Sequence, residues 1–386
     1  MCGITGYIGP RQAIEVALDT LKRLEYRGYD SAGVAVIGPA GLCLRRSVGK
    51  LENLLRLLNE NPASGCIGIG HTRWATHGGV TEANTHPHTD CQGHVVVIQN
   101  GIVENYVELK QALRAEGHEF RSQTDTEVIA HLIEKYYLVD SCPCRKLIEA
   151  VTISLQEIEG SYALIVMSEG EDGLVFARKD SPLILGLGDS ETFMASDIPA
   201  LMDFTSRIIY LEDGDVGMAT AHQIHINLNG RTVRRPEQRI SWPVEQAPKG
   251  GYEHFMLKEI HEQPRVIRDT LAAFRSFSGS SLTTLFTGDK LKLLLLLGCG
   301  TSYHAALIGR YVGEQYLGIT ARAEIASEFN YFSRNSSVPV GIVITQSGET
   351  ADTLKAMRRL KQRGTEIVAM TNIVGSSASR IADHTL

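Results

Sequence analysis

The chemistry that this chain could perform is suggested first by its second residue. Cys2 follows the initiator Met1, and nearby glycines let other backbone approach it closely. Once the methionine is removed, Cys2 carries a thiol with a reference pKa of about 8.5 and an α-amine of about 7.7 to 8.0. One residue then holds both the nucleophile and the base for acyl transfer. The alternative is a small apolar residue at the start of a strand, the commoner role of a free cysteine.

Four more residues offer what attack on a carboxamide needs. The tetrahedral oxyanion requires fixed donors, and the Asn100 side chain and the Gly101 N–H lie at the end of one predicted strand. An amino-acid substrate also needs a cation for its carboxylate and an anion for its ammonium group, which Arg73 and Asp125 supply. Taken singly, each has an ordinary interpretation: a solvated charge, a helix cap and a turn.

Two loops in the second half of the chain favour a phosphate site. Residues 298–302 follow the predicted strand 293–297, residues 345–350 follow the predicted strand 340–344, and each loop leads into a predicted helix. Bare backbone N–H groups and positive helix ends at such loops suit a phosphate without a metal. Neither loop is a Walker A or GxGxxG motif, and two ordinary helix starts are the alternative.

The histidines at positions 71, 77, 86, 88 and 94 raise the question of a metal. His86-Pro87-His88 lacks the paired cysteines or the helical i, i+4 spacing of recognised zinc sites. We therefore predict neither a metal nor a cofactor, and we interpret these histidines as hydrogen-bonding loop residues.

The elements that must position these residues change character near position 240. The earlier part combines strands, then helices, then many short strands. We predict strands at 4–8, 34–37, 66–69 and 95–98, helices at 13–24, 104–115, 126–138 and 144–158, and short strands over 161–233. This order predicts antiparallel sheets with segregated helices. The later part alternates helices with apolar strands, at 253–275, 293–297, 301–317, 340–344, 350–363 and 366–370. Such alternation predicts a parallel sheet covered on both faces.

Length and composition indicate two soluble domains. The chain has 386 residues, 43% of them apolar and 21% charged, and a formal net charge of -6. These values argue against disorder and against a nucleic-acid partner. Seven cysteines without a regular framework, and no run of 18 apolar residues, predict a cytoplasmic protein without a membrane partner. We predict domains at 2–235 and 253–386, joined by a linker at 236–252 that is rich in proline and glycine.

Several motifs together resemble one enzyme family. Cys2-Gly3-Ile4, residues 24–33, residues 71–78, Asn100-Gly101 and residues 124–127 resemble the glutaminase domain of the isomerising glutamine:fructose-6-phosphate aminotransferases. Residues 299–302 and 346–350 are similar to the sugar-phosphate loops of the sugar isomerase (SIS) domain in that family. The resemblance covers nearly the whole chain.

The resemblance implies a fold and a set of site residues. The fold would be an α+β four-layer N-terminal-nucleophile (Ntn) sandwich of antiparallel sheets, followed by an incomplete α/β parallel-sheet SIS domain. Cys2 would attack the amide while Asn100 and Gly101 hold the oxyanion. The implied glutamine-binding residues are Arg73, Thr76, His77, Gly101 and Asp125, and Trp74 would gate ammonia. The implied sugar-phosphate residues are Ser302, Thr345, Gln346, Ser347 and Thr350, with Thr345 replacing the serine usual there.

The implied reaction transfers ammonia from L-glutamine to fructose 6-phosphate, giving glucosamine 6-phosphate and glutamate, the first step of amino-sugar biosynthesis by the hexosamine pathway. The family also implies a homo-oligomer at full length and a chain that continues past Leu386. We therefore expect a truncated chain that retains only the glutaminase half.

Two alternatives remain beside this enzyme. Another glutamine amidotransferase would need a phosphoribosyl-pyrophosphate signature or an SGGxDS loop, and neither is found. A sugar-phosphate-binding regulatory protein with a silent glutaminase domain would tolerate loss of Cys2, Arg73 or Asp125, but all three are present.

Overall fold

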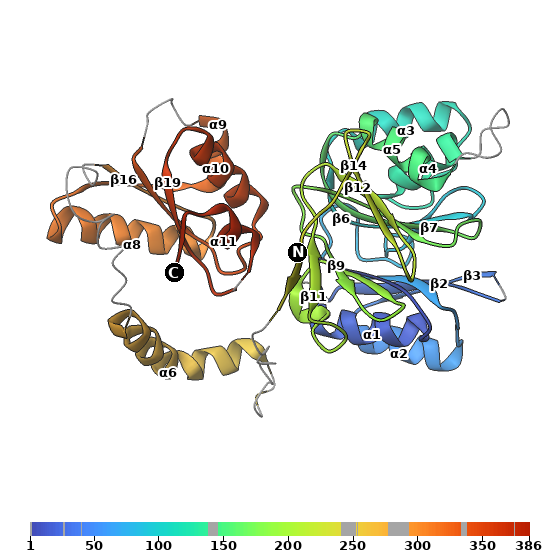
Figure 1. The fold of residues 1–386 in the computed structure, drawn as a ribbon, viewed down its shortest axis with the longest axis horizontal. Helices are drawn as coiled ribbons and strands as arrows, with labels where there is room; N and C mark the ends of the chain where they lie inside the picture. The colour runs from blue at the N-terminus through green and yellow to red at the C-terminus, as the bar shows by residue number, and fades with distance from the viewer. Residues whose placement is uncertain are drawn as a thin grey trace. The chain divides into compact units, whose positions relative to one another are not determined.

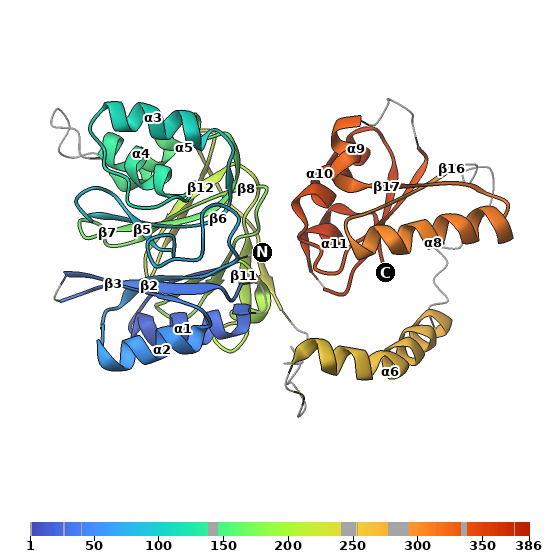
Figure 2. The same cartoon turned by 180° about the vertical axis from the view of Figure 1, so that it is seen from behind.

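The computed structural model divides the chain into two compact units, Met1–Trp242 and Pro243–Leu386 (Figures 1 and 2). It describes residues 2–25, 28–39, 41–137, 146–240, 252, 254–276, 293–332, 338–373 and 375–386. Motif residues 26 and 27 and linker residues 241–251 lie outside the described residues. No helix in the part of the chain described is long and apolar enough to cross a membrane.

Two antiparallel sheets form the centre of the first unit. The strands of the eight-stranded sheet are, in spatial order, β15 (Glu237–Arg239), β11 (Arg207–Tyr210), β9 (Ile184–Leu187), β10 (Thr192–Ala195), β1 (Gly3–Ile8), β4 (Ile67–Arg73), β2 (Ser31–Gly38) and β3 (Gly41–Val48). Those of the seven-stranded sheet are β14 (Arg231–Val233), β13 (Ile224–Leu228), β12 (Asp215–Ala219), β8 (Leu174–Lys179), β7 (Gly160–Ser168), β6 (Val95–Val103) and β5 (His88–Thr89).

Helices cover the outer face of each sheet, which makes four layers (Figure 1). The helices of the first unit are α1 (Ala13–Leu24) and α2 (Leu51–Glu60) on the larger sheet, α3 (Tyr106–Ala115), α4 (Glu127–Tyr137) and α5 (Leu147–Glu157) on the smaller one, and the short 3-10 helix Ile198–Ala200. Ile4 and Ile98 are buried in the core between the sheets, while Leu21 of α1 and Leu132 of α4 lie in the two outer cores. Burial of these apolar faces holds the layers together.

The edge of the larger sheet differs from the sequence prediction. Strand β15 pairs antiparallel with β11 and lies inside the stretch predicted as linker, 236–252. All three of its residues are exposed, so no apolar alternation marked it as a strand. Its pairing is accompanied by an ion pair of 2.7 Å between Arg207 Nε and Glu237 Oε1.

A parallel sheet forms the centre of the second unit, as the alternation of strands and helices predicts. In spatial order its strands are β17 (Thr320–Ile325), β16 (Leu293–Gly298), β18 (Val340–Ile344), β19 (Glu366–Met370) and β20 (His384–Thr385). The helices are α6 (Phe255–Ser276), α8 (Thr301–Tyr316), α9 (Ala326–Phe332), α10 (Ala351–Gln362) and α11 (Ser377–Ile381). Leu296 packs with Ala306 of α8 on one face, and Leu297 packs with Leu354 of α10 on the other.

The strand order of this sheet places a topological switch point between β16 and β18. The chain leaves β16 through α8 to β17 on one side, and β18 pairs with β16 on the other side. In open parallel sheets, ligands bind outside the carboxyl ends of the strands at such a point. The loops at 298–302 and 345–350 follow these two strands.

Candidate functional site

The register of β1 and β4 places Cys2 beside the loop that follows β4. Gly3 lies opposite Thr72, so the residue before Gly3 reaches the start of the loop. There the Trp74 backbone N–H donates to Cys2 Sγ at 3.1 Å, and the sulfur lies 3.5 Å from Trp74 O. Burial raises the pKa of the Cys2 thiol above its usual value, so a base is needed to activate it.

The Asn100 side chain from β6 faces Cys2 and is held by His71 from β4. His71 Nε2 lies 3.1 Å from the backbone carbonyl of Gln99 and 3.1 Å from Asn100 Oδ1. A carbonyl oxygen only accepts, so Nε2 carries the proton. Asn100 therefore presents Oδ1 to His71 and directs Nδ2 to Cys2, where it donates to the backbone oxygen at 2.9 Å.

Gly101 follows in a conformation that requires glycine. Its φ is 145°, and a Cβ atom at this position would lie 2.0 Å from Ser161 O. A side chain would therefore displace β6 from β7. The candidate oxyanion residues Asn100 and Gly101 thus lie in a strand, and the alternative of a simple turn is wrong.

Arg73 is buried and bound to its own loop. The residue is only 3% exposed. Its guanidinium donates to the carbonyls of His77 and Gly79, the second at 3.2 Å. No carboxylate among the described residues pairs with it. A buried cation without a counter-ion favours the arrival of an anion. The interpretation of Arg73 as a solvated surface charge is therefore wrong.

Asp125 supplies the opposite charge nearby. Its residue is 4% exposed, its Oδ2 accepts the Val103 N–H at 2.8 Å, and its Oδ1 lies 3.8 Å from His77 Nδ1. The alternative interpretation made Asp125 a cap of α4, but its side chain binds the backbone of β6 instead. Thr76 is exposed, with Oγ1 3.4 Å from the same His77 nitrogen. His77 therefore connects the two charged residues, because its carbonyl accepts from Arg73 and its ring faces Asp125.

Three histidines form a buried stack behind Asn100. The rings of His71 and His86 lie 4.1 Å apart and nearly parallel, whereas those of His86 and His88 meet edge-on at 4.6 Å. Burial lowers the pKa of His71 to about 3 and that of His88 to about 3. His71 and His88 lie in strands β4 and β5, not in loops as predicted. The stack is neutral at pH 7 and gives a rigid, uncharged support for Asn100.

This stack predicts a pH-dependent stability of the first unit. The folded pKa of about 3 for His88 lies below the unfolded value of about 6.5, so between these values the unfolded chain binds more protons. The free energy of unfolding should therefore fall as the pH decreases from about 6.5 towards 3, by on the order of 1.4 kcal/mol per pH unit for each histidine. Tryptophan fluorescence during guanidinium unfolding reports this, because Trp74 and Trp242 both lie in residues 1–242.

The matched variants for this test are His88→Gln and His225→Gln. The first removes a buried titrating ring, so the free energy of unfolding should change less steeply with pH, by the contribution of one histidine. The second replaces an exposed histidine of β13 and should leave the slope unchanged. Equal slopes in all three proteins would contradict the assignment.

The two loops of the second unit lie at the same edge of the parallel sheet. The Thr353 hydroxyl, in the first turn of α10 after the second loop, donates to the sulfur of Cys299 in the first loop at 3.7 Å. Gly348 has a φ of 67°, and a Cβ atom on it would lie 2.2 Å from Ser376 Oγ. Thr345 is buried, and its hydroxyl accepts the Gly348 N–H at 3.3 Å.

The remaining candidate phosphate residues are more open. Ser302, Ser347 and Thr350 are partly exposed, and Gln346 is exposed. The Ser347 hydroxyl accepts the Glu349 N–H at 3.2 Å. The hydroxyls therefore lie near helix N-termini at the carboxyl edge of the sheet, where an anion is favoured.

Sequence reasoning missed one group of potential ligands, Cys91, His118, His131 and Glu134, which come together in the first unit. The available signal was His131 and Glu134 at helical i, i+3 spacing. Cys91 and His118 are distant in sequence, so only the fold reveals their proximity.

Comparison with known families matches both units. Residues 71–203 match the glutamine amidotransferase domain family, and residues 290–386 match the SIS domain family. The predicted resemblance is confirmed: glutamine--fructose-6-phosphate aminotransferase [isomerizing] of Pyrococcus horikoshii is 47% identical over 391 residues, and that of Clostridium tetani is 46% identical over 397. Both alignments cover 100% of this chain and 64% of the relative.

The solved structures support the fold class. A glutamine phosphoribosylpyrophosphate amidotransferase from B. subtilis matches with a TM-score of 0.52 at 18% identity, covering 100% of this chain and 90% of that chain. The structure described as the allosteric regulatory enzyme of purine biosynthesis also has a TM-score of 0.52, at 20% identity, covering 96% and 80%. The predicted Ntn sandwich of antiparallel sheets followed by a parallel-sheet SIS domain is confirmed.

Proposed function

We propose, from the premise that this chain joins a glutamine amidotransferase domain to an SIS domain, that it belongs to an isomerising glutamine:fructose-6-phosphate aminotransferase. The first unit would hydrolyse the amide of L-glutamine, and the second would bind fructose 6-phosphate, the acceptor of the ammonia. The products of the whole reaction would be glucosamine 6-phosphate and glutamate. The observation that carries this proposal is the pair of hydrogen bonds at Cys2: the Trp74 N–H donates to its sulfur, and Asn100 Nδ2 donates to its backbone oxygen.

The proposed hydrolysis has two steps. The α-amine of Cys2 accepts the thiol proton, and the sulfur attacks the amide carbon. Asn100 Nδ2 and the Gly101 N–H stabilise the resulting oxyanion. Its collapse breaks the C–N bond, passes the proton to the departing nitrogen and leaves a thioester. Water then cleaves the thioester, releasing glutamate and restoring the thiol.

The proposed glutamine contacts use charges of both signs. Arg73 would bind the α-carboxylate in place of the carbonyls of its own loop, and Asp125 would bind the α-ammonium group. His77 and Thr76 would complete the pocket between them, supported by the contact of the His77 and Tyr106 rings at 5.3 Å. This arrangement would select a free amino acid over a peptide-linked glutamine, since both backbone charges are required.

Arg73→Lys is expected to raise the KM for glutamine by roughly 10- to 100-fold with a smaller change in kcat, since lysine lacks the planar pair of donors that grips a carboxylate. Steady-state glutamate release measures both constants. Arg114→Lys, an exposed arginine of α3, is the matched control. A KM unchanged in Arg73→Lys would remove the carboxylate role from this residue.

The proposed sugar-phosphate site lies at the switch point of the parallel sheet. Ser302, Gln346, Ser347 and Thr350 would contact the phosphate, and Thr345 would act with them by fixing the Gly348 N–H. Support comes from the N-termini of α8 and α10, which follow adjacent strands. No metal is required for a phosphate held in this way.

Ser347→Ala is expected to weaken binding of fructose 6-phosphate by roughly tenfold or more, because a hydrogen bond to a charged group is lost. Calorimetric titration with fructose 6-phosphate and with fructose separates the phosphate contribution from that of the sugar. Ser379→Ala in α11 of the same unit should bind as the unaltered chain does. Equal affinity for fructose and its phosphate would argue against the site.

We also propose an ammonia gate, a cellular location and an oligomeric state. Trp74 would gate the released ammonia; the residue is 48% exposed, and its ring meets the Tyr29 ring edge-on at 5.4 Å. A cytoplasmic location is supported by the free thiols of Cys2, Cys43, Cys66, Cys91 and Cys299. A homo-oligomer is supported by exposed apolar residues of α8 such as Ile308 and Tyr311.

The deciding experiment measures glutamate release by the purified chain and binding of fructose 6-phosphate by the same preparation. We expect both glutamate release and sugar-phosphate binding. Binding of the sugar phosphate without any glutamate release would favour the silent regulatory protein instead. Glutamate release without sugar-phosphate binding would support only the amidotransferase half.

A further inference from the structure

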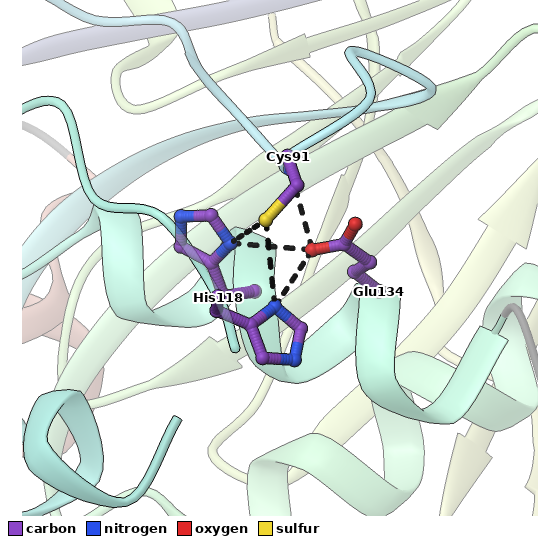
Figure 3. Close-up of side chains that lie close together, drawn as sticks. Cys91, His118 and Glu134 are labelled. Carbon is purple, nitrogen blue, oxygen red and sulfur yellow. Dashed lines mark hydrogen bonds and ion pairs between the residues drawn. The ribbon is translucent and has the colours of Figure 1, made fainter. Parts of the chain in front are cut away.

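We propose that Cys91, His118, His131 and Glu134 form a structural binding site for one zinc-like divalent transition-metal ion in the first unit (Figure 3). Each residue offers one ligand atom, and the four atoms lie within 4.8 Å of one another. In Figure 3 the sulfur, two ring nitrogens and one carboxylate oxygen point towards a common centre. The site is independent of the proposed glutaminase chemistry and uses none of its residues.

The distances between these atoms fit the edges of a tetrahedron around zinc. Zn–S bonds of about 2.3 Å and Zn–N or Zn–O bonds of about 2.0–2.1 Å require S···N edges of about 3.6 Å and N···O edges of about 3.4 Å. The Cys91 sulfur lies 3.7 Å from His118 Nδ1 and 3.5 Å from His131 Nδ1. Glu134 Oε2 lies 2.8 Å and 3.2 Å from the same two nitrogens. These two carboxylate edges are shorter than about 3.4 Å, so Glu134 Oε2 must move slightly away from both nitrogens when a metal ion replaces the hydrogen bonds.

Three separate segments contribute the ligands. Cys91 lies in the turn between β5 and β6, His118 follows α3, and His131 and Glu134 lie one turn apart on α4. An ion bound here would join the β5–β6 turn to the helices that cover the smaller sheet. It would also fix α4, which begins two residues after Asp125.

The surroundings of the ligands resemble those of known metal sites. The second nitrogen of His131, Nε2, is buried without a hydrogen-bond partner and lies 3.8 Å from Glu127 Oε1. A carboxylate behind a metal-bound histidine orients the ring and raises its basicity. The Glu119 backbone N–H also donates to the Cys91 sulfur at 3.4 Å, which favours a thiolate.

The donor set identifies the class of ion and its role. One thiolate, two imidazoles and one carboxylate in a tetrahedron suit zinc better than magnesium or calcium, which prefer oxygen. Four protein ligands leave no open position for a substrate, and His131 and Glu134 are buried. The role is therefore structural. The competing explanation is a metal-free hydrogen-bonded cluster in which Glu134 accepts from both histidines.

The test compares metal content and cobalt spectra of the full chain, prepared without a polyhistidine tag. Plasma mass spectrometry after dialysis should find about one zinc ion per chain. The cobalt-substituted protein should show the d–d bands of tetrahedral Co²⁺ and a thiolate-to-cobalt charge-transfer band. Cys91→Ser should lose the charge-transfer band and most of the zinc. Glu127→Gln should retain the band with affinity reduced by roughly 10- to 100-fold.

His94→Gln and Cys66→Ser are the matched controls, because both residues are exposed and outside the cluster. Both should bind zinc as the unaltered chain does. If a ligand variant fails to fold, titration of the unaltered, chelator-treated chain with cobalt still tests the site. Absence of bound zinc together with absence of a charge-transfer band at micromolar cobalt would overturn the site in favour of the hydrogen-bonded cluster.

Discussion

Cys2→Ala is expected to lower the rate of glutamine hydrolysis by roughly 10⁴-fold or more, since the covalent route disappears with the sulfur. The fold should survive, because the hydrogen bonds of the Cys2 sulfur to the described residues involve only the backbone of Trp74. Asn100 can still donate to the backbone oxygen of residue 2, which the substitution preserves. Glutamate release under saturating glutamine measures the loss, and circular dichroism measures the fold.

The control for this prediction is Cys66→Ala, which changes an exposed cysteine just before β4 and should retain full activity. Intact mass should show that Met1 is absent from active protein, because the mechanism needs a free amine on Cys2. Turnover that persists in Cys2→Ala, or full activity in protein that retains Met1, would rule out the assigned nucleophile and base.

Asn100→Ala is expected to lower kcat for glutamine hydrolysis by roughly 10²- to 10³-fold with little change in KM, as for the loss of one oxyanion donor. The effect falls on kcat because the donor is needed most when negative charge develops on the amide oxygen. His71 keeps its bond to the Gln99 carbonyl in this variant, so the buried ring retains a partner. Steady-state kinetics separates the two constants.

The matched control is Asn227→Ala. It removes a side-chain amide from β13, which is in the same sheet as Asn100 but away from Cys2. Its kinetics should equal those of the unaltered chain. If Asn100→Ala instead raised KM and left kcat intact, Asn100 would bind ground-state glutamine and the oxyanion would have to be stabilised elsewhere.

Strands with apolar faces and helices with strong periodicity could be predicted from sequence because burial imposes their patterns. The predicted strand at 95–98 is the buried start of β6, and the predicted helix at 144–158 corresponds to α5 at Leu147–Glu157. Strands β3, β15 and β17 were not predicted. Each lies at the edge of its sheet, where pairing with one neighbour stabilises a strand most of whose side chains remain partly or fully exposed.

The residues of the site could be predicted by type, but their arrangement could not. The need for an oxyanion donor and for charges of both signs follows from chemistry, and it led to the choice of Asn100, Arg73 and Asp125, whose roles stay predictions. That His71 orients Asn100 depends on two sheets packing face to face. The ligand group around Cys91 depends equally on packing between segments distant in sequence. Neither relationship leaves a local pattern in the chain.

The hydrogen bond from the Trp74 backbone to the Cys2 sulfur joins the proposed nucleophile to the segment that begins with Arg73. In the proposed mechanism, a rearrangement of this segment as glutamine binds would also change the hydrogen bonding of the sulfur. Occupancy of the site and reactivity of the thiol would then be coupled through a single peptide group.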